Sequence, residues 1–197
     1  MKKEFNIIAN LVKKKSKVLD VGCGDGELMK YINENITNDI RGLEISKSNV
    51  QKCVAKWLTV IEGDAEKDLK QFPNSSFDYV ILSQKLQAFL DPENVISELL
   101  RVGKKAIVTI PNFGYWKVRF HLLIKGTMPV TKNLPNEWYN TPNLHMCTIQ
   151  DFVNFCYKKK IKIDKSMCLT NEKISEITNK NMQYKNIFSQ LGIFLIE

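Results

Sequence analysis

The 197-residue sequence has little that would suit a membrane, an oxidising compartment or a metal site. Its apolar runs, such as 106–110, are far shorter than the roughly 20 residues that a transmembrane helix needs. The N-terminus has no continuous apolar stretch of the kind found in secretory signals. The five cysteines form no C-x-x-C pair, and His145-x-Cys147 has no second pair at zinc-finger spacing, so no metal is expected. We therefore expect a cytoplasmic protein with reduced thiols and no membrane contact.

Arginine is scarce as well, since only three of the 29 basic residues are arginine. Arginine is the side chain suited to binding phosphate through two parallel hydrogen bonds, and lysine does not replace it in that role. The net charge of +8 is therefore attributed to lysines that solvate the surface. Nucleic acid is disfavoured as a partner, and a reaction on nucleic acid stays open only as a minor hypothesis that rests on this charge.

Short apolar runs and amphipathic stretches alternate along most of the chain. Hydrophobic residues make up 44% and charged residues 25%, so we expect one domain over 1–197. Apolar runs that end in turn residues predict strands at 18–21, 40–45, 58–62, 77–82 and 105–110. Helical periodicity predicts helices at 4–14, 28–36, 48–55, 93–102 and 148–157. Two late strands, 161–169 and 187–196, are expected to form an antiparallel hairpin at the sheet edge. The alternation predicts an α/β, Rossmann-like fold, with a mostly parallel seven-stranded sheet, an antiparallel last strand and helices on both faces.

Residues 112–147 interrupt this alternation. They contain three prolines and a cluster of aromatic residues, and the stretch is too long for an idle loop. Tyr115, Trp116 and Trp138 are suited to lining the pocket of a small acceptor substrate. Such residues are equally common as interface anchors. We expect an inserted segment that serves as a lid over an acceptor or as a docking surface for a partner.

The turn after the first predicted strand has the composition of a ligand-binding loop. Gly22 and Gly24 allow the backbone to approach a ligand closely, with Cys23 between them and Asp20 and Asp25 on either side. The spacing is G-x-G-x-G, which differs from the G-x-G-x-x-G of dinucleotide-binding turns. Two carboxylates would repel a pyrophosphate and attract the ammonium and sulfonium groups of S-adenosylmethionine. The loop therefore favours that nucleoside; the alternative is a tight turn whose aspartates only face water.

Polar residues also follow the next three predicted strands. Glu44 ends the second strand, where a carboxylate is able to accept both ribose hydroxyls, and Ile45 is placed to pack on adenine. Asp64 follows the third strand and is expected to accept from the adenine amino group, to cap a helix, or both. The residues after the fourth strand should border the methyl-bearing end of the ligand. The predicted cofactor-binding residues are Asp20, Gly22, Cys23, Gly24, Asp25, Glu44, Ile45, Gly63, Asp64, Ala65, Ser83 and Gln84.

Together, VLDVGCGDG at 18–26, Glu44, Asp64 and FDYV at 77–80 resemble the motifs of class I S-adenosylmethionine-dependent methyltransferases. The resemblance implies the class I methyltransferase fold, with S-adenosylmethionine as cofactor and S-adenosylhomocysteine as product. It further implies that the loop residues Asp20, Gly22 and Gly24 hold the methionine moiety. By the same likeness, Glu44 holds the ribose, and Asp64 with Ala65 holds the adenine edge.

Longer segments resemble the MetW family of methionine biosynthesis proteins. They are LSQKLQA at 82–88, PNFGYW at 111–116, GTMPVTKNLP at 126–135 and WYNTPNLHMCTIQDF at 138–152. Lys85 and Asn136 depart from the threonine and tyrosine expected at these positions. The resemblance implies a methyltransferase-like protein of methionine biosynthesis without an assigned methyl acceptor. It also implies the homoserine O-acyltransferase MetX as a partner.

The sequence leaves the reaction open. No Asn/Asp-Pro-Pro-aromatic motif follows the fourth strand, and by resemblance this disfavours adenine and amide nitrogens as acceptors. His145 and Tyr139 are the candidate proton acceptors of the aromatic segment, although a histidine flanked by Leu144 and Met146 is more often structural. Two hypotheses carry nearly equal weight: methyl transfer to a small-molecule or protein acceptor, and a non-catalytic, cofactor-binding regulatory partner of MetX.

Overall fold

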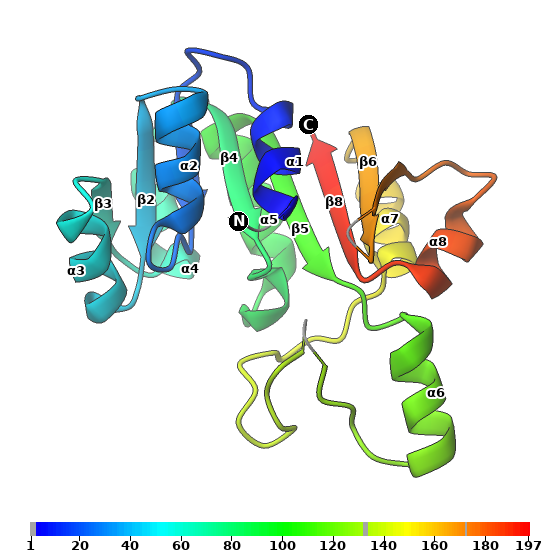
Figure 1. Cartoon of the computed structure of the whole chain (residues 1–197). Coiled ribbons are helices and arrows are strands. Elements are labelled where there is room, and N and C mark those ends of the chain that lie inside the picture. Colours follow the sequence, from blue (N-terminus) through cyan, green and yellow to red (C-terminus); the bar gives the residue numbers. More distant parts are fainter. Residues whose placement is uncertain (1–2, 132–133, 172) are drawn as a thin grey trace.

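An eight-stranded sheet runs through the computed structural model, which describes residues 3–131, 134–171 and 173–197 (Figure 1). The strands are β1 (Val18–Val21), β2 (Ile40–Glu44), β3 (Thr59–Glu62), β4 (Phe77–Ser83), β5 (Gly103–Pro111), β6 (Ile163–Thr170), β7 (Lys173–Glu176) and β8 (Leu191–Ile196). The helices are α1 (Lys3–Leu11), α2 (Glu27–Asn35), α3 (Lys47–Ala55), α4 (Ala65–Asp68), α5 (Pro92–Val102), α6 (Trp116–Lys125), α7 (Ile149–Lys158) and α8 (Met182–Phe188). Two 3-10 turns complete them, η1 (Leu69–Gln71) and η2 (Leu86–Ala88). The strands and helices predicted from the sequence are all present, although the first helix ends at Leu11 and the last strand begins only at Leu191.

The strand order is β3-β2-β1-β4-β5-β8-β6-β7. Strands β1 to β5 pair in parallel, so Val21 of β1 lies between Leu43 of β2 and Leu82 of β4. Strand β8 runs antiparallel to both β5 and β6, as the sequence predicted. The prediction of seven strands was one short, because β7 pairs with β6 inside the expected connection. Its four residues are too few and too polar to give a strand pattern. The carboxyl ends of five parallel strands therefore meet at one edge.

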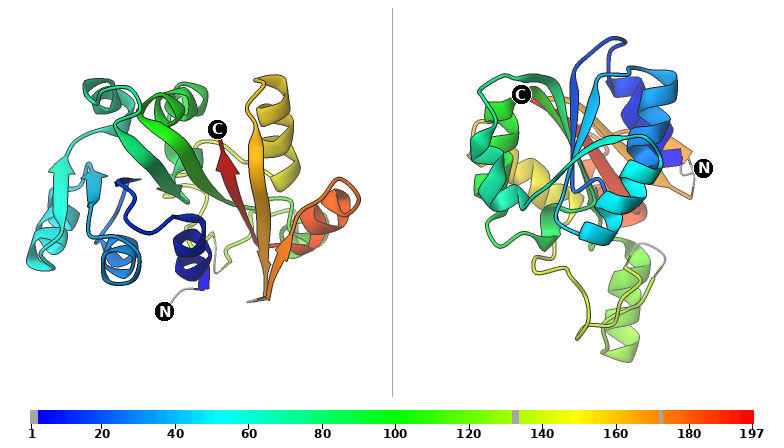
Figure 2. Two further views of the ribbon diagram at one scale, coloured as in Figure 1. Left: turned by 90° about the horizontal axis from the view of Figure 1, so that it is seen from above. Right: turned by 90° about the vertical axis from the view of Figure 1, so that its left-hand side faces the viewer.

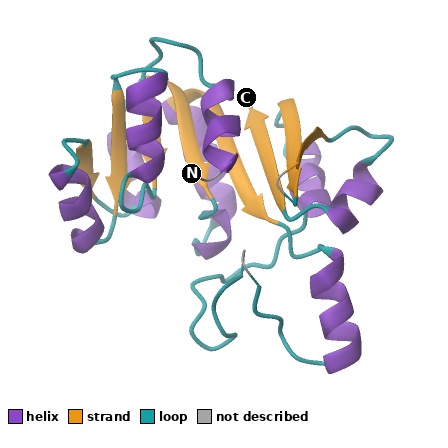
Figure 3. Ribbon diagram, viewed as in Figure 1, coloured by secondary structure: helices purple, strands orange, loops and turns teal. Residues whose placement is uncertain are grey.

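Helices cover both faces of the sheet (Figure 2, Figure 3). Helices α1, α2 and α3 pack on one face with Ile81 and Ile107, and α5 and α7 pack on the other with Val80 and Val108. Because the central strands are buried on both sides, they are almost continuously apolar, which explains why the sequence reveals them. No helix in the described part of the chain has the length and apolar character needed to cross a membrane.

The described residues of the range 112–147 leave the carboxyl end of β5 and project beyond that end of the strands (Figure 1). They contain α6, which periodicity did not predict, because Val118 is the buried residue of a helix whose other apolar side chains face outward. Tyr115, Val118 and Leu134 form a small apolar cluster of their own. Residues 132 and 133, which belong to the motif at 126–135, lie outside the described residues.

The segment rejoins the sheet at two places. The backbone N–H groups of Leu144 and His145 donate to the carbonyl of Gln87 at 2.8 and 3.0 Å. Thr148 then caps helix α7: its hydroxyl accepts from the backbone N–H of Asp151, while the Asp151 carboxylate accepts from the backbone N–H of Thr148. This reciprocal capping box fixes where the projecting segment ends.

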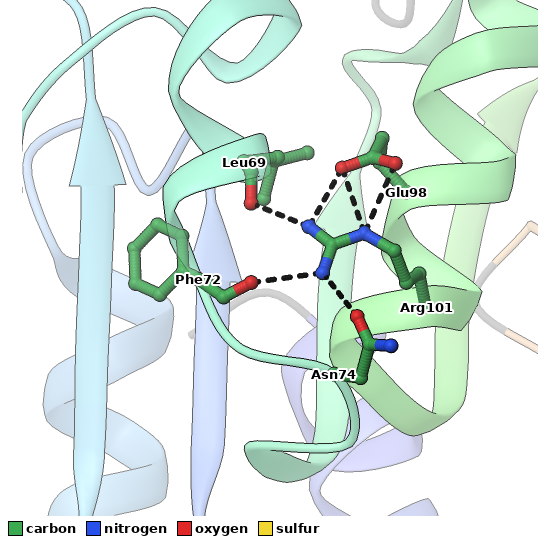
Figure 4. Close-up of polar contacts among 5 residues, drawn as sticks. All are labelled: Leu69, Phe72, Asn74, Glu98 and Arg101. Atoms are coloured by element: carbon green, nitrogen blue, oxygen red, sulfur yellow. Dashed lines mark hydrogen bonds and ion pairs between the residues drawn. The ribbon is translucent and has the colours of Figure 1, made fainter.

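One polar cluster fastens η1 and the turn before β4 onto α5 (Figure 4). The Arg101 guanidinium pairs with Glu98, with its Nη2 at 2.8 Å from a carboxylate oxygen. It also donates to the carbonyls of Leu69 and Phe72 and to the side chain of Asn74. This ion pair lowers the pKa of Glu98 and raises that of Arg101, because each charge stabilises the other. The cluster joins three backbone segments through one planar cation.

Replacing Arg101 by lysine should destabilise the protein by about 2 kcal/mol, because an ammonium cannot reach the same five acceptor atoms. Urea unfolding followed by circular dichroism measures the change. The matched variant Arg41→Lys alters an exposed arginine whose ion pair with Asp39 spans 4.0 Å, so it should change stability by less than about 0.5 kcal/mol. Equal stabilities for the two variants would show that the Arg101 contacts contribute nothing.

Candidate functional site

A cleft of about 310 Å³ opens at the carboxyl edge of the sheet, between α1 and the ends of β1 and β4. Its lining residues are Glu4, Phe5, Asp20, Gly22, Cys23, Gly24, Asp25, Glu27, Leu28, Ser83, Gln84 and Lys85. Seven of the predicted cofactor residues are among them: Asp20, Gly22, Cys23, Gly24, Asp25, Ser83 and Gln84. The structure thus brings together residues from the ends of two neighbouring strands.

The loop after β1 adopts the conformation that its glycines allow. Gly22 and Gly24 have φ angles of +68° and +59°, in the left-handed region that side chains other than glycine rarely adopt. Nothing lies within 4 Å of the position that a Cβ of Gly24 would take. The backbone at Gly24 therefore faces open space, where a ligand is able to approach it closely.

Glu44 holds this loop from the neighbouring strand. It is buried, and one carboxylate oxygen accepts from the backbone N–H of Gly24 at 2.8 Å. The other oxygen accepts from the backbone N–H of Ser46 at 3.0 Å. Each oxygen keeps a further lone pair, so the carboxylate is able both to shape the loop and to accept a ligand hydroxyl.

Asp20 is the most deeply placed acid of the cleft, at 2% exposed. Burial raises its pKa to about 8, and the negative charge of Glu44 adds to the rise while the Lys85 cation opposes it. The ligand-free protein therefore holds Asp20 largely protonated at neutral pH. A cationic ligand beside it would stabilise the ionised form.

Glu4 is a second buried acid of the cleft, and sequence analysis missed it. It comes from α1, and its carboxylate accepts from Ser83 Oγ at 2.9 Å, from Gln84 Nε2 at 2.6 Å and from Thr109 Oγ1 at 3.0 Å. Only the packing of α1 over the ends of β4 and β5 creates this site. The one available signal was an acidic residue within the apolar stripe of the first helix.

Lys85 brings a positive charge into the same cleft. Its side chain passes so close to Gly22 that a Cβ there would lie 3.1 Å from Lys85 Cγ. This residue is one of the two departures from the expected family pattern. The cleft consequently combines four carboxyl groups, from Glu4, Asp20, Asp25 and Glu27, with one lysine.

Asp25 is already paired. Lys56 Nζ lies 3.3 Å from its carboxylate and donates to its carbonyl at 2.7 Å. Cys23 is buried beside it, and burial together with nearby Asp20 raises the pKa of the Cys23 thiol. These two residues line the walls of the cleft, while Asp20 and Glu4 are its buried acids.

The remaining predicted cofactor residues lie outside the lining of this cleft. Ile45 is 66% exposed. Asp64 caps α4 by accepting from the backbone of Glu66 at 3.0 Å, as the helix-cap alternative predicted. Gly63 is packed so tightly that a Cβ would lie 2.8 Å from Asp68 Oδ2, and Ala65 is buried.

His145 and Tyr139, the candidate proton acceptors, do not line the cleft either. Tyr139 is exposed and stacks edge-on against the equally exposed Trp138. His145 lies at the rim of a different cavity. The structure therefore does not bring either side chain to the residues that the sequence marked for the cofactor.

The fold is that of class I S-adenosylmethionine-dependent methyltransferases. A methyltransferase from Thermotoga maritima, described as a possible histamine N-methyltransferase, superposes with a TM-score of 0.71 over 98% of this chain and 87% of its own, at 16% identity. An S-adenosylmethionine-dependent methyltransferase from Mesorhizobium loti gives a TM-score of 0.71 over 99% of this chain and 97% of its own, at 15% identity. At such identities the likeness concerns the fold.

Within that class, the chain belongs to the family of the methionine biosynthesis protein MetW, whose family model matches residues 2–196. The bifunctional methionine biosynthesis protein MetXA/MetW of Rhodopirellula baltica is 31% identical over 169 residues. That match covers 81% of this chain and 27% of the relative, so the chain spans only a minor part of the relative's length. The chain is therefore a member of the MetW family with a methyltransferase fold.

Proposed function

We propose that the cleft binds S-adenosylmethionine and that the protein transfers its methyl group to an acceptor. The observation that carries the proposal is the pair of buried acids, Asp20 and Glu4, beside an open glycine loop. Buried carboxyl groups favour a cationic ligand, and the exposed backbone of Gly24 leaves room for it. A pyrophosphate would instead face several carboxylates and one lysine.

The residues present fit this cofactor. Asp20 is placed to hold the ammonium group of the methionine moiety, and Gly22 and Gly24 provide the close backbone approach. Glu44 has lone pairs left for the ribose hydroxyls after bonding the loop. Ser83 and Gln84, oriented by Glu4, border the cleft at the end of β4. For the adenine edge, Asp64 and Ala65 remain the proposed residues.

When bound, S-adenosylmethionine supplies an electrophilic methyl group for in-line displacement. The protein's own part is to position an acceptor and exclude water, and positioning alone lowers such barriers greatly. The acceptor class stays a small molecule or a protein. Some acceptors must lose a proton when they are methylated. Neither His145 nor Tyr139 lines the cleft, so we assign no residue of this chain as the base that takes this proton.

Calorimetric titration of the purified chain with S-adenosylmethionine and S-adenosylhomocysteine tests the binding step. We expect micromolar binding of both, and a negligible heat for NAD, which carries a pyrophosphate. Turnover is tested separately by incubating the protein with S-adenosylmethionine and a cell extract, and by measuring S-adenosylhomocysteine. Binding without product formation would reject methyl transfer and leave the regulatory function standing.

A specific observation favours a second function, docking to a homoserine O-acyltransferase. The projecting segment exposes several large apolar side chains: Trp116, Phe120, Leu123, Ile124, Trp138, Tyr139 and Met146. Large apolar and aromatic side chains exposed on a surface commonly serve in protein interfaces. The Rhodopirellula baltica relative joins MetXA and MetW in one chain, which supports association between such partners.

The docking proposal predicts a complex with the MetX acyltransferase of the same genome at micromolar concentrations, measured by analytical ultracentrifugation. Replacing Leu123, which is 82% exposed on α6, by serine should weaken it at least about tenfold, because apolar anchors dominate interface affinity. The control is Trp57→Ser, which changes an exposed residue between α3 and the outermost strand β3. This variant should leave the affinity for MetX unchanged. Absence of any complex would reject the docking function.

Lys85 gives a prediction of its own. Replacing it by threonine should tighten binding of S-adenosylmethionine by about threefold and change S-adenosylhomocysteine binding less, because only the former carries the sulfonium charge. Calorimetry at low ionic strength measures both. Lys30→Thr, which removes an exposed lysine paired with Glu34 on α2, is the matched control. Equal effects on the two nucleosides would contradict this charge argument.

A further inference from the structure

Directly after β4, two neighbouring polar side chains, Gln84 and Lys85, line the cleft. Gln84 has a φ angle of +52°, in the left-handed region that residues other than glycine rarely adopt. Its backbone N–H donates to the carbonyl and to the hydroxyl of Thr109, at 3.1 and 3.0 Å. Strained backbone persists only where the surrounding structure imposes it, and it clusters at functional sites. This conformation therefore marks the end of β4 as a place where side-chain position matters.

The side-chain amide of Gln84 is held in one orientation. Its Nε2 donates to the Glu4 carboxylate at 2.6 Å. Because a carboxylate has no hydrogen to donate, the amide oxygen Oε1 points away from Glu4. Oε1 has no hydrogen-bond partner among the described residues, and its surface is not closed off by neighbouring atoms. The cleft is thus lined by a residue whose hydrogen-bond acceptor is both fixed and accessible.

Lys85 is the one cation among the described residues that line the cleft, and it is exposed. Its side chain lies against the glycine loop at Gly22, and its charge opposes the rise in the pKa of Asp20. The acids nearby leave the ammonium group free, since Asp25 already pairs with Lys56 and no ion pair of Lys85 occurs in the described part of the chain. Such a cation disfavours the sulfonium group and favours an anionic group on a second ligand.

We infer that the methyl acceptor is a small molecule that carries both a carboxylate and a hydroxyl or amino group. Lys85 binds the carboxylate, and Gln84 Oε1 accepts a hydrogen bond from the O–H or N–H group that is methylated. This inference rests on the proposed methyl transfer, and it narrows the acceptor to one chemical class. Both residues orient the acceptor, and neither takes its proton.

The reaction on such an acceptor balances without a further reagent. The acceptor's oxygen or nitrogen forms the new bond to the methyl carbon, and the methyl–sulfur bond breaks with its electron pair going to sulfur. The proton of the acceptor passes to water. The amide oxygen of Gln84 is too weak a base to remove this proton, so its part is to hold the nucleophile in place.

Three probes of matched size test the inference on the full chain, saturated with S-adenosylhomocysteine. 4-Hydroxybutanoate carries both groups, pentanoate has a methyl group in place of the hydroxyl, and 4-hydroxybutanamide has a neutral amide in place of the carboxylate. In an NMR titration, 4-hydroxybutanoate should shift the backbone amides of Gly22, Gln84 and Lys85. It should bind at least about threefold more tightly than either of the others. Equal affinities, or shifts confined to other residues, would overturn the inference.

Two variants separate the two contacts. Lys85→Met keeps a long side chain without its charge and should remove the preference over 4-hydroxybutanamide. Gln84→Asn keeps an amide that tolerates the left-handed backbone but has a shorter reach, so it should remove the preference over pentanoate. The control Lys30→Met changes an exposed lysine outside the lining of the cleft and should keep both preferences. A preference that survives its own variant would refute the site.

The affinity for S-adenosylhomocysteine separates the failure of this inference from the failure of the proposed function. If the wild type does not bind this nucleoside, the proposed cofactor site is wrong and the inference fails with it. If the nucleoside binds and the probes show no preference, only the acceptor class is wrong. A loss of about threefold or more in nucleoside affinity for Lys85→Met would assign Lys85 to the carboxylate of the nucleoside's own methionine moiety, and this result would also overturn the inference.

Discussion

The affinity for S-adenosylmethionine should rise about tenfold for each pH unit between roughly pH 5.5 and 7. In the ligand-free protein the pKa of Asp20 stands at about 8, so the carboxyl group is protonated in this range. A bound ammonium or sulfonium group favours the carboxylate, so binding releases one proton. Rising pH therefore promotes binding until the free carboxyl group is itself ionised. Calorimetry across this range, in buffers of different ionisation enthalpy, measures both the slope and the proton.

Asp20→Asn is the decisive variant for this slope. It keeps the size of the side chain, cannot ionise, and should leave a pH-independent and weaker affinity. Asp25→Asn is the control, because Asp25 is partly exposed and already paired with Lys56. If Asp20→Asn kept the wild-type dependence of affinity on pH, a group other than Asp20 would release the proton on binding. Asp20 would then not be part of the binding site.

The same carboxyl group links pH to stability. Its pKa is raised from the ordinary value near 3.8 to about 8, so the folded state binds more protons than the unfolded chain between these values. Stability of the ligand-free protein should therefore fall as pH rises through that window. Asp20→Asn removes this loss and should be more stable than the wild type near pH 8. Thermal unfolding at pH 5 and pH 8 gives the comparison.

Replacing Glu4 by alanine should weaken nucleoside binding by about 10- to 100-fold and destabilise the protein by about 2 kcal/mol. The carboxylate is the common acceptor for Ser83, Gln84 and Thr109, and its loss frees the Gln84 side chain that lines the cleft. Calorimetry and urea unfolding measure the two effects. Because α1 is held at this point, hydrogen exchange along the helix should also accelerate.

Two further variants sharpen the Glu4 prediction. Glu4→Gln preserves the shape but sets an NH2 group against a donor, so it should lose affinity while retaining most of the packing. Glu27→Gln changes an exposed acid that lines the same cleft and should alter affinity by less than about threefold. If Glu27→Gln matched Glu4→Ala, general negative charge rather than the buried hydrogen bonds would govern binding.

The sequence predicted the structure best where an element's burial or backbone geometry requires particular residue types. The strands that begin at Val18, Ile40 and Phe77 are apolar because both faces of the sheet are covered, and the turn at Gly22 to Gly24 is recognisable because it requires left-handed backbone. Glu44 was predicted as a ligand for ribose. The structure gives it an additional role as the acceptor that shapes the glycine loop.

Prediction failed where a role depends on distant packing. Helix α6 has apolar residues on all sides, and β7 has only four residues. Neither element therefore shows a clear periodic spacing of apolar residues in the sequence. Tyr139 and His145 were singled out for their chemistry, although neither reaches the cleft.

By itself, the sequence determined the alternating α/β sheet and the glycine turn, because burial on both faces and backbone geometry leave local patterns. Only the tertiary structure decided that Glu4, 79 residues away from Ser83, completes the cleft and that Lys85 enters it. Such contacts depend on which strand ends lie side by side and on which helix covers them. The spacing of residues along the chain does not reveal this arrangement.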